Sequence, residues 1–192
     1  MNDVAIILAS GASRRMGTPK ALFRWRGETL LERALRITLE AELSTFIVLG
    51  AHREEILAQS NLQGATLIEN PHWELGMGHS IATAVTAIPE GWSRLLLLNV
   101  DQPLIEVAHL RRLVDGCKDS IDATVTRYES GLTGTPACFS SRLHEDLQNL
   151  NGDKGARQIL RSGSLTLAEI PGSGRDLDTP EDWAAFLKEY GP

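Results

Sequence analysis

The chain has 192 residues, of which 42% are hydrophobic and 23% are charged, and this balance is ordinary for a globular protein. Its net charge of −6 argues against a general nucleic-acid-binding protein, which should be basic. The two cysteines lack metal-type spacing, and no apolar run approaches the length of a membrane span. We therefore expect a single domain over residues 1–192, in the reducing cytoplasm, without a nucleic-acid or membrane partner.

The first predicted strand, residues 4–8, leads into a loop of small and cationic residues. Small residues at 9–13 let a ligand approach the backbone, so that consecutive N–H groups can converge on phosphate oxygens. Arg14, Arg15 and Lys20 add positive charge to the same loop. Because ligands of open α/β sheets bind at the carboxyl ends of strands, the loop is a candidate polyanion site. The alternative is a mobile connection with solvated charges.

Two common phosphate-binding motifs are missing from this loop. Ser13 and Met16 stand at the later glycine positions of G-x-G-x-x-G, which disfavours a nicotinamide-dependent oxidoreductase. Lys20 follows Pro19 and precedes Ala21, so the loop is not G-x-x-x-x-G-K-[ST] either.

Strands alternate with helices along the rest of the chain, which predicts a three-layer α/β/α sandwich with a mostly parallel, Rossmann-like sheet. Thr29 is expected to cap the first helix and Asp153 a later one. The further predicted strands are 44–50, 65–70, the leucine run of 93–99, 121–128, the end of 131–139, and 165–170. The further predicted helices are 52–59, one that begins near Ser80, one that begins near Pro103, 156–161, and one after Thr179.

Residues 70–80 contain Gly76 and Gly78 and precede a helix whose first N–H groups could face an anion. Within them, Trp73 is as consistent with the core or a partner surface as with a ligand platform. His72 and His79 suggest a metal pair, but no third ligand has a defined spacing, so we interpret them as polar loop residues. We interpret His52, after the second strand, as a solvated loop histidine.

Asp101 lies at the carboxyl end of a predicted strand with four consecutive leucines, which are typical of a strand buried on both faces. A hard divalent cation such as Mg²⁺ is one natural partner for this carboxylate, and capping of the next helix is an equal alternative. Near the end of the chain, Thr179 and Pro180 have the pattern of a helix N-terminus. This capping pattern gives a structural reason for Thr179 and Pro180 but none for the aspartate at position 178.

Together these stretches resemble the MobA-like nucleotidyltransferases, which include the molybdenum cofactor cytidylyltransferases and guanylyltransferases. Ser10 stands where the first group usually carries Ala and the second Gly, and Thr135 stands where the family usually carries His. The first loop is similar to the family motif L-A-[AG]-G-x-S-x-R-M-G-x-x-K, and residues 70–80 are similar to N-P-x-W-x-x-G-M-x-x-S. Residues 100–103 are similar to G-D-Q-P, and residues 131–139 to G-x-x-G-H-P-[VA]-x-F. Residues 152–157 are similar to G-D-K-G-A-R, and residues 176–182 to D-x-D-T-P-E-D.

The resemblance implies an enzyme in which an acceptor phosphate attacks the α-phosphorus of an NTP, with CTP the expected nucleotide, and pyrophosphate leaves. The implied acceptor is molybdopterin or the molybdenum cofactor, and a molybdoenzyme is a further expected partner. The implied catalytic residues are Arg15, Lys20 and Asp101; the metal ligands for Mg²⁺ or Mn²⁺ are Asp101 and Asp178; the acceptor-binding residues are Thr135, Pro136, Lys154 and Asp178; the nucleotide-binding residues are Leu8, Ala9, Ser10, Gly11, Ser13, Arg15, Lys20, Asn70, Gly76, Met77 and Ser80.

Two alternatives remain at this point. A guanylyltransferase, or a transferase acting on another phosphate acceptor, would keep the same loop and aspartate. A non-catalytic carrier or chaperone of the molybdenum cofactor would need neither Lys20 nor Asp101, so their presence argues against it.

Overall fold

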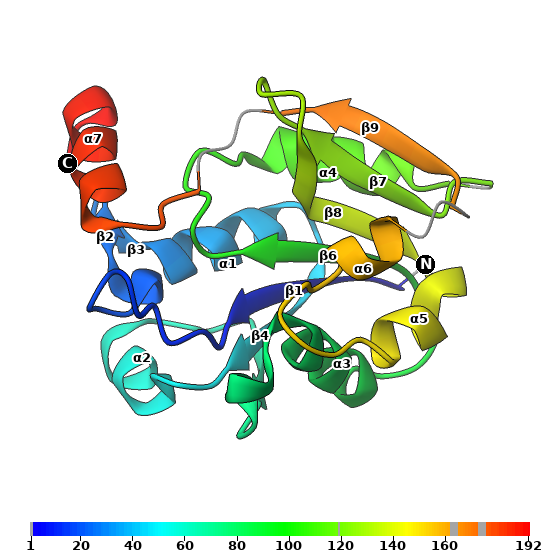
Figure 1. Cartoon of the computed structure of the whole chain (residues 1–192), viewed down its shortest axis with the longest axis horizontal. Helices are drawn as coiled ribbons and strands as arrows, with labels where there is room; N and C mark the ends of the chain where they lie inside the picture. The colour runs from blue at the N-terminus through cyan, green and yellow to red at the C-terminus, as the bar shows by residue number, and fades with distance from the viewer. Residues whose placement is uncertain (1, 119, 162–164, 173–175) are drawn as a thin grey trace.

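The computed structural model describes residues 2–118, 120–161, 165–172 and 176–192, and a seven-stranded sheet forms its centre (Figure 1). The strand order is β5-β4-β1-β6-β8-β7-β9. β8 runs antiparallel to its neighbours β6 and β7, whereas the other neighbouring strands pair in parallel, which confirms the mostly parallel sheet. The strands are β1 (Asn2–Ala9), β4 (Ser44–Leu49), β5 (Thr66–Glu69), β6 (Trp92–Asn99), β7 (Ala123–Arg127), β8 (Thr133–Ser140) and β9 (Leu167–Pro171).

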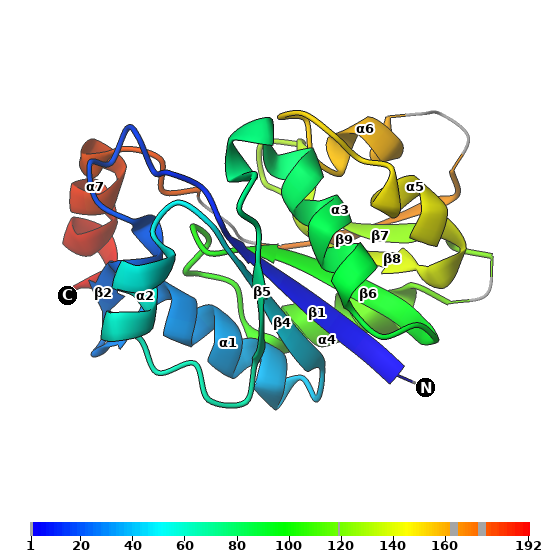
Figure 2. The ribbon, with the colours of Figure 1, turned by 90° about the horizontal axis from the view of Figure 1, so that it is seen from below.

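Helices cover both faces of the sheet, as the view from below shows (Figure 2). Alternate residues of β1 enter two separate cores because successive side chains of a strand point to opposite faces. Ile6 packs in the core with α3, α5 and α6, and Ile7 packs in the core with α1, α2 and α4. This arrangement confirms the three-layer sandwich. The helices are α1 (Leu30–Glu40), α2 (Arg53–Gln59), α3 (Met77–Ala87), α4 (Val107–Gly116), α5 (His144–Gln148) and α6 (Arg157–Leu160).

The predicted cap of α1 is confirmed, and three other helix starts differ from expectation. Thr29 and Glu32 form a reciprocal capping box at α1. Pro103 does not begin a helix: a turn intervenes, in which the N–H of Ile105 donates to Gln102 O, and α4 begins only at Val107. The helix expected from Ser80 starts earlier, at Met77. Asp153 does not cap α6, since Ala156 holds that position without a side-chain bond.

A small hairpin and the last helix form a third core at one end of the molecule (Figure 1). The hairpin, β2 (Arg24–Trp25) with β3 (Glu28–Thr29), turns at residues 26–27, and α7 (Pro180–Tyr190) packs against it. The ring centroids of Trp25 and Phe186 lie 4.9 Å apart, and Trp25 Nε1 donates to Gly191 O at 3.0 Å. This packing fixes the start of α7 beside the first loop.

The sheet has a topological switch point between β1 and β6. The chain leaves β1 for β4 on one side and later adds β6 on the other, so the carboxyl ends of β1 and β6 border a crevice. The first loop follows β1, and Asp101 follows β6. In the part of the chain that the structure describes, no helix is long and apolar enough to cross a membrane.

Candidate nucleotide site

A cleft of about 510 Å³ lies over the carboxyl ends of β1 and β6. Its walls come from the first loop, the start of α3, the residues after β6, and two segments from later in the chain. The lining residues are Leu8, Ala9, Ser10, Gly11, Ala12, Ser13, Arg14, Arg15, Lys20, Trp73, Glu74, Gly76, Met77, Ser80, Asn99, Val100, Asp101, Asp153 and Asp178.

The first loop is held in shape by its own hydrogen bonds and by the neighbouring strand end. Ser13 Oγ accepts from the N–H of Lys20 at 3.1 Å, and Ser13 O accepts from the N–H of Met16 at 2.9 Å. His52 Nε2 lies 3.1 Å from Ala12 O, so this histidine contacts the loop and is not simply solvated as expected. The loop therefore presents its small residues to the cleft in a defined conformation.

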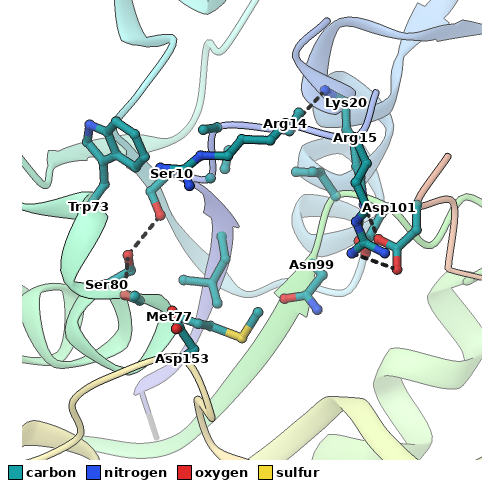
Figure 3. A pocket seen from close by; sticks show the side chains of 18 of the residues that line it. Ser10, Arg14, Arg15, Lys20, Trp73, Met77, Ser80, Asn99, Asp101 and Asp153 are labelled. Carbon is teal, nitrogen blue, oxygen red and sulfur yellow. Dashed lines mark hydrogen bonds and ion pairs between the residues drawn. The ribbon is translucent and has the colours of Figure 1, made fainter. Parts of the chain in front are cut away.

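Charged side chains meet at one end of the cleft, where Lys20 Nζ lies between two carboxylates (Figure 3). It is 3.1 Å from Asp101 Oδ2 and 2.5 Å from Asp178 Oδ1. Arg15 also reaches Asp178, with 3.3 Å between its guanidinium nitrogen and Oδ2. The structure thus brings together, around one ammonium group, the residues that the resemblance implied for catalysis and metal binding.

Burial and mutual charge set the electrostatics of this cluster. Burial raises the pKa of Asp101, Asp176 and Asp178 add to this effect, and Lys20 opposes it. For Lys20, burial disfavours the charge, but the two carboxylates outweigh it and raise the pKa. The hydrogen bond from Lys20 lowers the pKa of Asp178. Lys20 therefore keeps its positive charge, whereas its attraction does not offset the effect of burial on the pKa of Asp101.

Two buried oxygen atoms beside this cluster accept no hydrogen bond in the described residues: Asp101 Oδ1 and Asn99 Oδ1. Unpaired buried acceptors are costly, and carboxylate and amide oxygens are ligands that Mg²⁺ and Mn²⁺ prefer. With Asp178 they form an oxygen donor set that suits a divalent cation. Within the described residues, no group of three His, Cys, Asp or Glu side chains could hold a metal, so this donor set depends on the Asn99 amide beside the two carboxylates. Of the two histidines interpreted as loop residues, His72 lies in the turn before residues 73–75, whereas His79 lies within α3, so the interpretation was wrong for His79.

The opposite end of the cleft is held by uncharged hydrogen bonds. Ser10 Oγ donates to Ser80 Oγ at 2.8 Å, and Asn70 Nδ2 donates to the same oxygen at 3.0 Å. Asn70 is fully buried and lies behind the cleft wall, so the structure gives it a role in positioning Ser80. Trp73 and Met77 complete this end (Figure 3).

The three remaining acceptor-binding candidates lie outside the cleft wall. Thr135 lies behind the cleft residue Asn99, and its hydroxyl accepts a hydrogen bond from Asn99 Nδ2 at 3.1 Å. Pro136 is buried in β8, and Lys154 is exposed on the turn before α6. Asp178 is the candidate that the structure places in the cleft.

Sequence reasoning missed three polar residues that line the cleft, Glu74, Asn99 and Asp153, and one residue that connects its parts. Asn99 could have been found, because it lies two residues before Asp101 at the same strand end. No local signal pointed to Asp153 as a cleft residue. Gln102 Nε2 donates to Tyr128 Oη at 2.7 Å, and to Thr135 O and Asp176 Oδ1 at 2.9 Å each, which joins the loop after β6 to the segment that carries Asp178.

Comparison with known proteins gives relatives of nearly equal length. The chain is 32% identical to the purine catabolism protein PucB of Bacillus subtilis, over 94% of this chain and 93% of the relative. It is also 32% identical to nicotine blue oxidoreductase of Paenarthrobacter nicotinovorans, over 95% of each chain. Identity is 31% to a probable molybdenum cofactor guanylyltransferase of Synechococcus elongatus and 26% to the molybdenum cofactor cytidylyltransferase of Escherichia coli. These two alignments cover 97% and 96% of this chain, and 98% and 95% of the respective relatives.

A solved structure shows the same fold over the whole length. The crystal structure of Rv0371c from Mycobacterium tuberculosis matches with a TM-score of 0.87 and 28% identity, over 98% of each chain, and the same protein has been solved in complex with manganese. Residues 5–168 match the family described as the MobA-like NTP transferase domain. The chain therefore belongs to the MobA-like NTP transferase family, as its sequence motifs indicated.

Proposed function

We propose that the protein is a molybdenum cofactor cytidylyltransferase, which transfers CMP from CTP to the phosphate of molybdopterin or its molybdenum-loaded form and releases pyrophosphate. The observation that carries this proposal is the charged end of the cleft. There Lys20, Arg15, Asp101 and Asp178 converge beside a loop of small residues. The family membership supports nucleotidyl transfer as the reaction type.

The chemistry asks the protein mainly for positioning and charge neutralisation. The acceptor phosphate is already an anion, so no general base is needed. Arg15 and Lys20 stabilise negative charge on the α-phosphate and on the leaving pyrophosphate. The N–H groups of residues 9–13 can bind phosphate oxygens as the triphosphate enters the cleft.

A divalent cation fits the carboxylate pair. Asp101 and Asp178, with Asn99 beside them, would hold Mg²⁺ or Mn²⁺, and the bound ion would supply further neutralisation of the phosphate charges. Thr135, Pro136 and Lys154 are proposed for the acceptor side, because Thr135 contacts Asn99 at the cleft edge and Lys154 offers an exposed cation.

CTP is chosen because residues 152–157 have the cytidylyltransferase-like form G-D-K-G-A-R. Guanylyl transfer is the second candidate, since the Synechococcus guanylyltransferase is 31% identical over 97% of this chain. Ser10 is the residue to compare between the two, because its hydroxyl donates to Ser80 at the end of the cleft away from Lys20.

A thermal-shift series with CTP, GTP, ATP and UTP, each with Mg²⁺ or with EDTA, tests the proposal. A ligand that binds only the folded state stabilises it by about 3 kcal/mol at roughly one hundred times its dissociation constant. We expect a Mg²⁺-dependent rise in Tm that is largest with CTP. A largest shift with GTP would move the assignment to guanylyl transfer. No shift with any nucleotide would contradict nucleotidyl transfer, and pterin binding alone would then favour a carrier.

A further inference from the structure

The turn at residues 151–155 is locked onto the start of α3 by contacts between backbones. The N–H of Gly78 donates to Gly152 O at 2.7 Å. A Cβ on Gly78 would lie 2.5 Å from Asn151 O, and a Cβ on Gly155 would lie 2.7 Å from Met77 Sδ. The Asn151 backbone leaves no space for a side chain at Gly78, so this glycine allows the turn to form one wall of the cleft.

This turn places the carboxylate of Asp153 in the cleft. Asp153 Oδ1 lies 2.5 Å from the position that a Cβ on Gly76 would occupy, so the carboxylate packs directly against that glycine. Figure 3 shows Asp153 beside Met77, at the same end as Ser80 and away from the Lys20 cluster. The cleft thus carries a carboxylate away from the Lys20 cluster.

A carboxylate only accepts hydrogen bonds when ionised, and it repels phosphate. For Asp153, the suitable partner is therefore a hydrogen-bond donor on a part of the ligand that carries no negative charge. We propose that Asp153 binds the nucleoside of the NTP by accepting a hydrogen bond from a ribose hydroxyl or from the exocyclic amino group of the base. This assignment rests on the proposed nucleotidyltransferase function. Glu74 also lines the cleft and is the alternative carboxylate for this role.

The test is isothermal titration of the wild type and of Asp153→Asn with CTP, UTP and 2′-deoxy-CTP in the presence of Mg²⁺. Hydrogen bonds to charged groups are strong enough that their loss should weaken CTP binding by about tenfold or more. Asp146→Asn, which neutralises an exposed carboxylate on the nearby α5, should bind CTP as the wild type does. Circular dichroism checks that both variants remain folded.

The three nucleotides separate the two possible donors. If Asp153 binds the ribose 2′-hydroxyl, Asp153→Asn weakens CTP and UTP equally and leaves 2′-deoxy-CTP unchanged. If Asp153 binds the 3′-hydroxyl, all three nucleotides weaken together. If it binds the exocyclic amino group, CTP and 2′-deoxy-CTP weaken and UTP does not. Each of these patterns supports the inference.

Other outcomes overturn it. Unchanged binding of all three nucleotides by Asp153→Asn would show that the carboxylate makes no such bond. Tighter binding of all three would show that it acts only by repelling the triphosphate. A loss found in Glu74→Gln and absent from Asp153→Asn would assign the role to Glu74. Failure of the wild type to bind any nucleotide is a distinct result, because it contradicts the proposed function itself.

Discussion

Lys20 and Asp101 lie 81 residues apart in the chain, and 3.1 Å separates Nζ of the lysine from Oδ2 of the aspartate. The lysine ends the first loop after β1, and the aspartate follows β6, so the pair spans the switch point of the sheet. Asp178 meets the same Nζ from the start of α7. Three segments that are distant in sequence thus meet at one half-buried ammonium group.

Replacing Lys20 with Ala should abolish turnover and leave the fold intact. The variant loses a cation that stabilises developing charge, and loss of one such group lowers kcat by about 100-fold or more. Steady-state pyrophosphate release measures the effect, and far-UV circular dichroism monitors the fold. Lys188→Ala removes an exposed lysine of α7 and serves as the control. Normal turnover in Lys20→Ala would remove this residue from the mechanism.

Substitution of Asp101 or Asp178 should change how the nucleotide-induced thermal shift depends on Mg²⁺. Asp101→Asn removes the carboxylate with an unpaired buried oxygen, so we expect the Mg²⁺-dependent part of the nucleotide thermal shift to disappear. Asp178→Asn should raise the Mg²⁺ concentration needed for half of the shift. Asp115→Asn, whose carboxylate is exposed on α4, is the matched control. The metal assignment fails if both cleft variants keep the wild-type Mg²⁺ titration.

Gln102→Glu should lower the free energy of unfolding and kcat together. The native amide donates to three acceptors, and a carboxylate in its place would face Tyr128, Thr135 O and Asp176 without those bonds. Loss of buried hydrogen bonds costs about 1–3 kcal/mol. Urea unfolding measures the loss, with the exposed Gln158→Glu on α6 as control. If Gln102→Glu has the same free energy of unfolding as the wild type, this hydrogen-bond network does not stabilise the site.

Gly78→Ala should destabilise the protein, because its Cβ would lie 2.5 Å from Asn151 O. Moving the 151–155 turn away from α3 should cost about 1–3 kcal/mol. Gly11→Ala is the control for stability alone, since nothing lies within 4 Å of its added Cβ. Equal Tm values for the two variants would contradict the tight packing of the turn.

His109 should make the protein less stable as the pH falls below neutrality. Burial, aided by Arg112, lowers the pKa of its imidazole to about 4, from 6.5 for a free side chain. Below pH 6.5 the unfolded chain binds a proton that the folded chain does not, so stability is lost progressively down to about pH 4. At about 1.4 kcal/mol for each pKa unit, the loss reaches about 3 kcal/mol.

Urea unfolding of the wild type and His109→Gln between pH 7 and pH 4 checks this expectation. The glutamine variant is expected to be less sensitive to pH over that range. Identical pH dependence in the two proteins would show that the imidazole does not remain neutral in the folded state.

The sheet and its helices were accessible from sequence because their patterns are local. The leucine run of β6 and the apolar run of β1 indicate buried strands by composition alone, and Thr29 identifies the start of α1 through its capping partner. The hairpin of β2 and β3 was missed because each strand has two residues and its stability comes from packing against α7.

The candidate site was predictable where motifs are contiguous, as in the first loop. Which residues face one another was not, because side chains 158 residues apart meet only through the tertiary fold, as Lys20 and Asp178 do. The position of Asp153 was unpredictable for the same reason. The local sequence around it is typical of a helix cap, and only the packing of its turn against α3 places it in the cleft.

The most direct test of the proposed function is pyrophosphate release from CTP and Mg²⁺, measured with and without molybdopterin. We expect release that requires the acceptor, is stopped by EDTA, yields the cytidine dinucleotide of the pterin, and is lost in Lys20→Ala. Absence of pyrophosphate release with each of the four nucleotides, from protein that binds the pterin, would contradict nucleotidyl transfer.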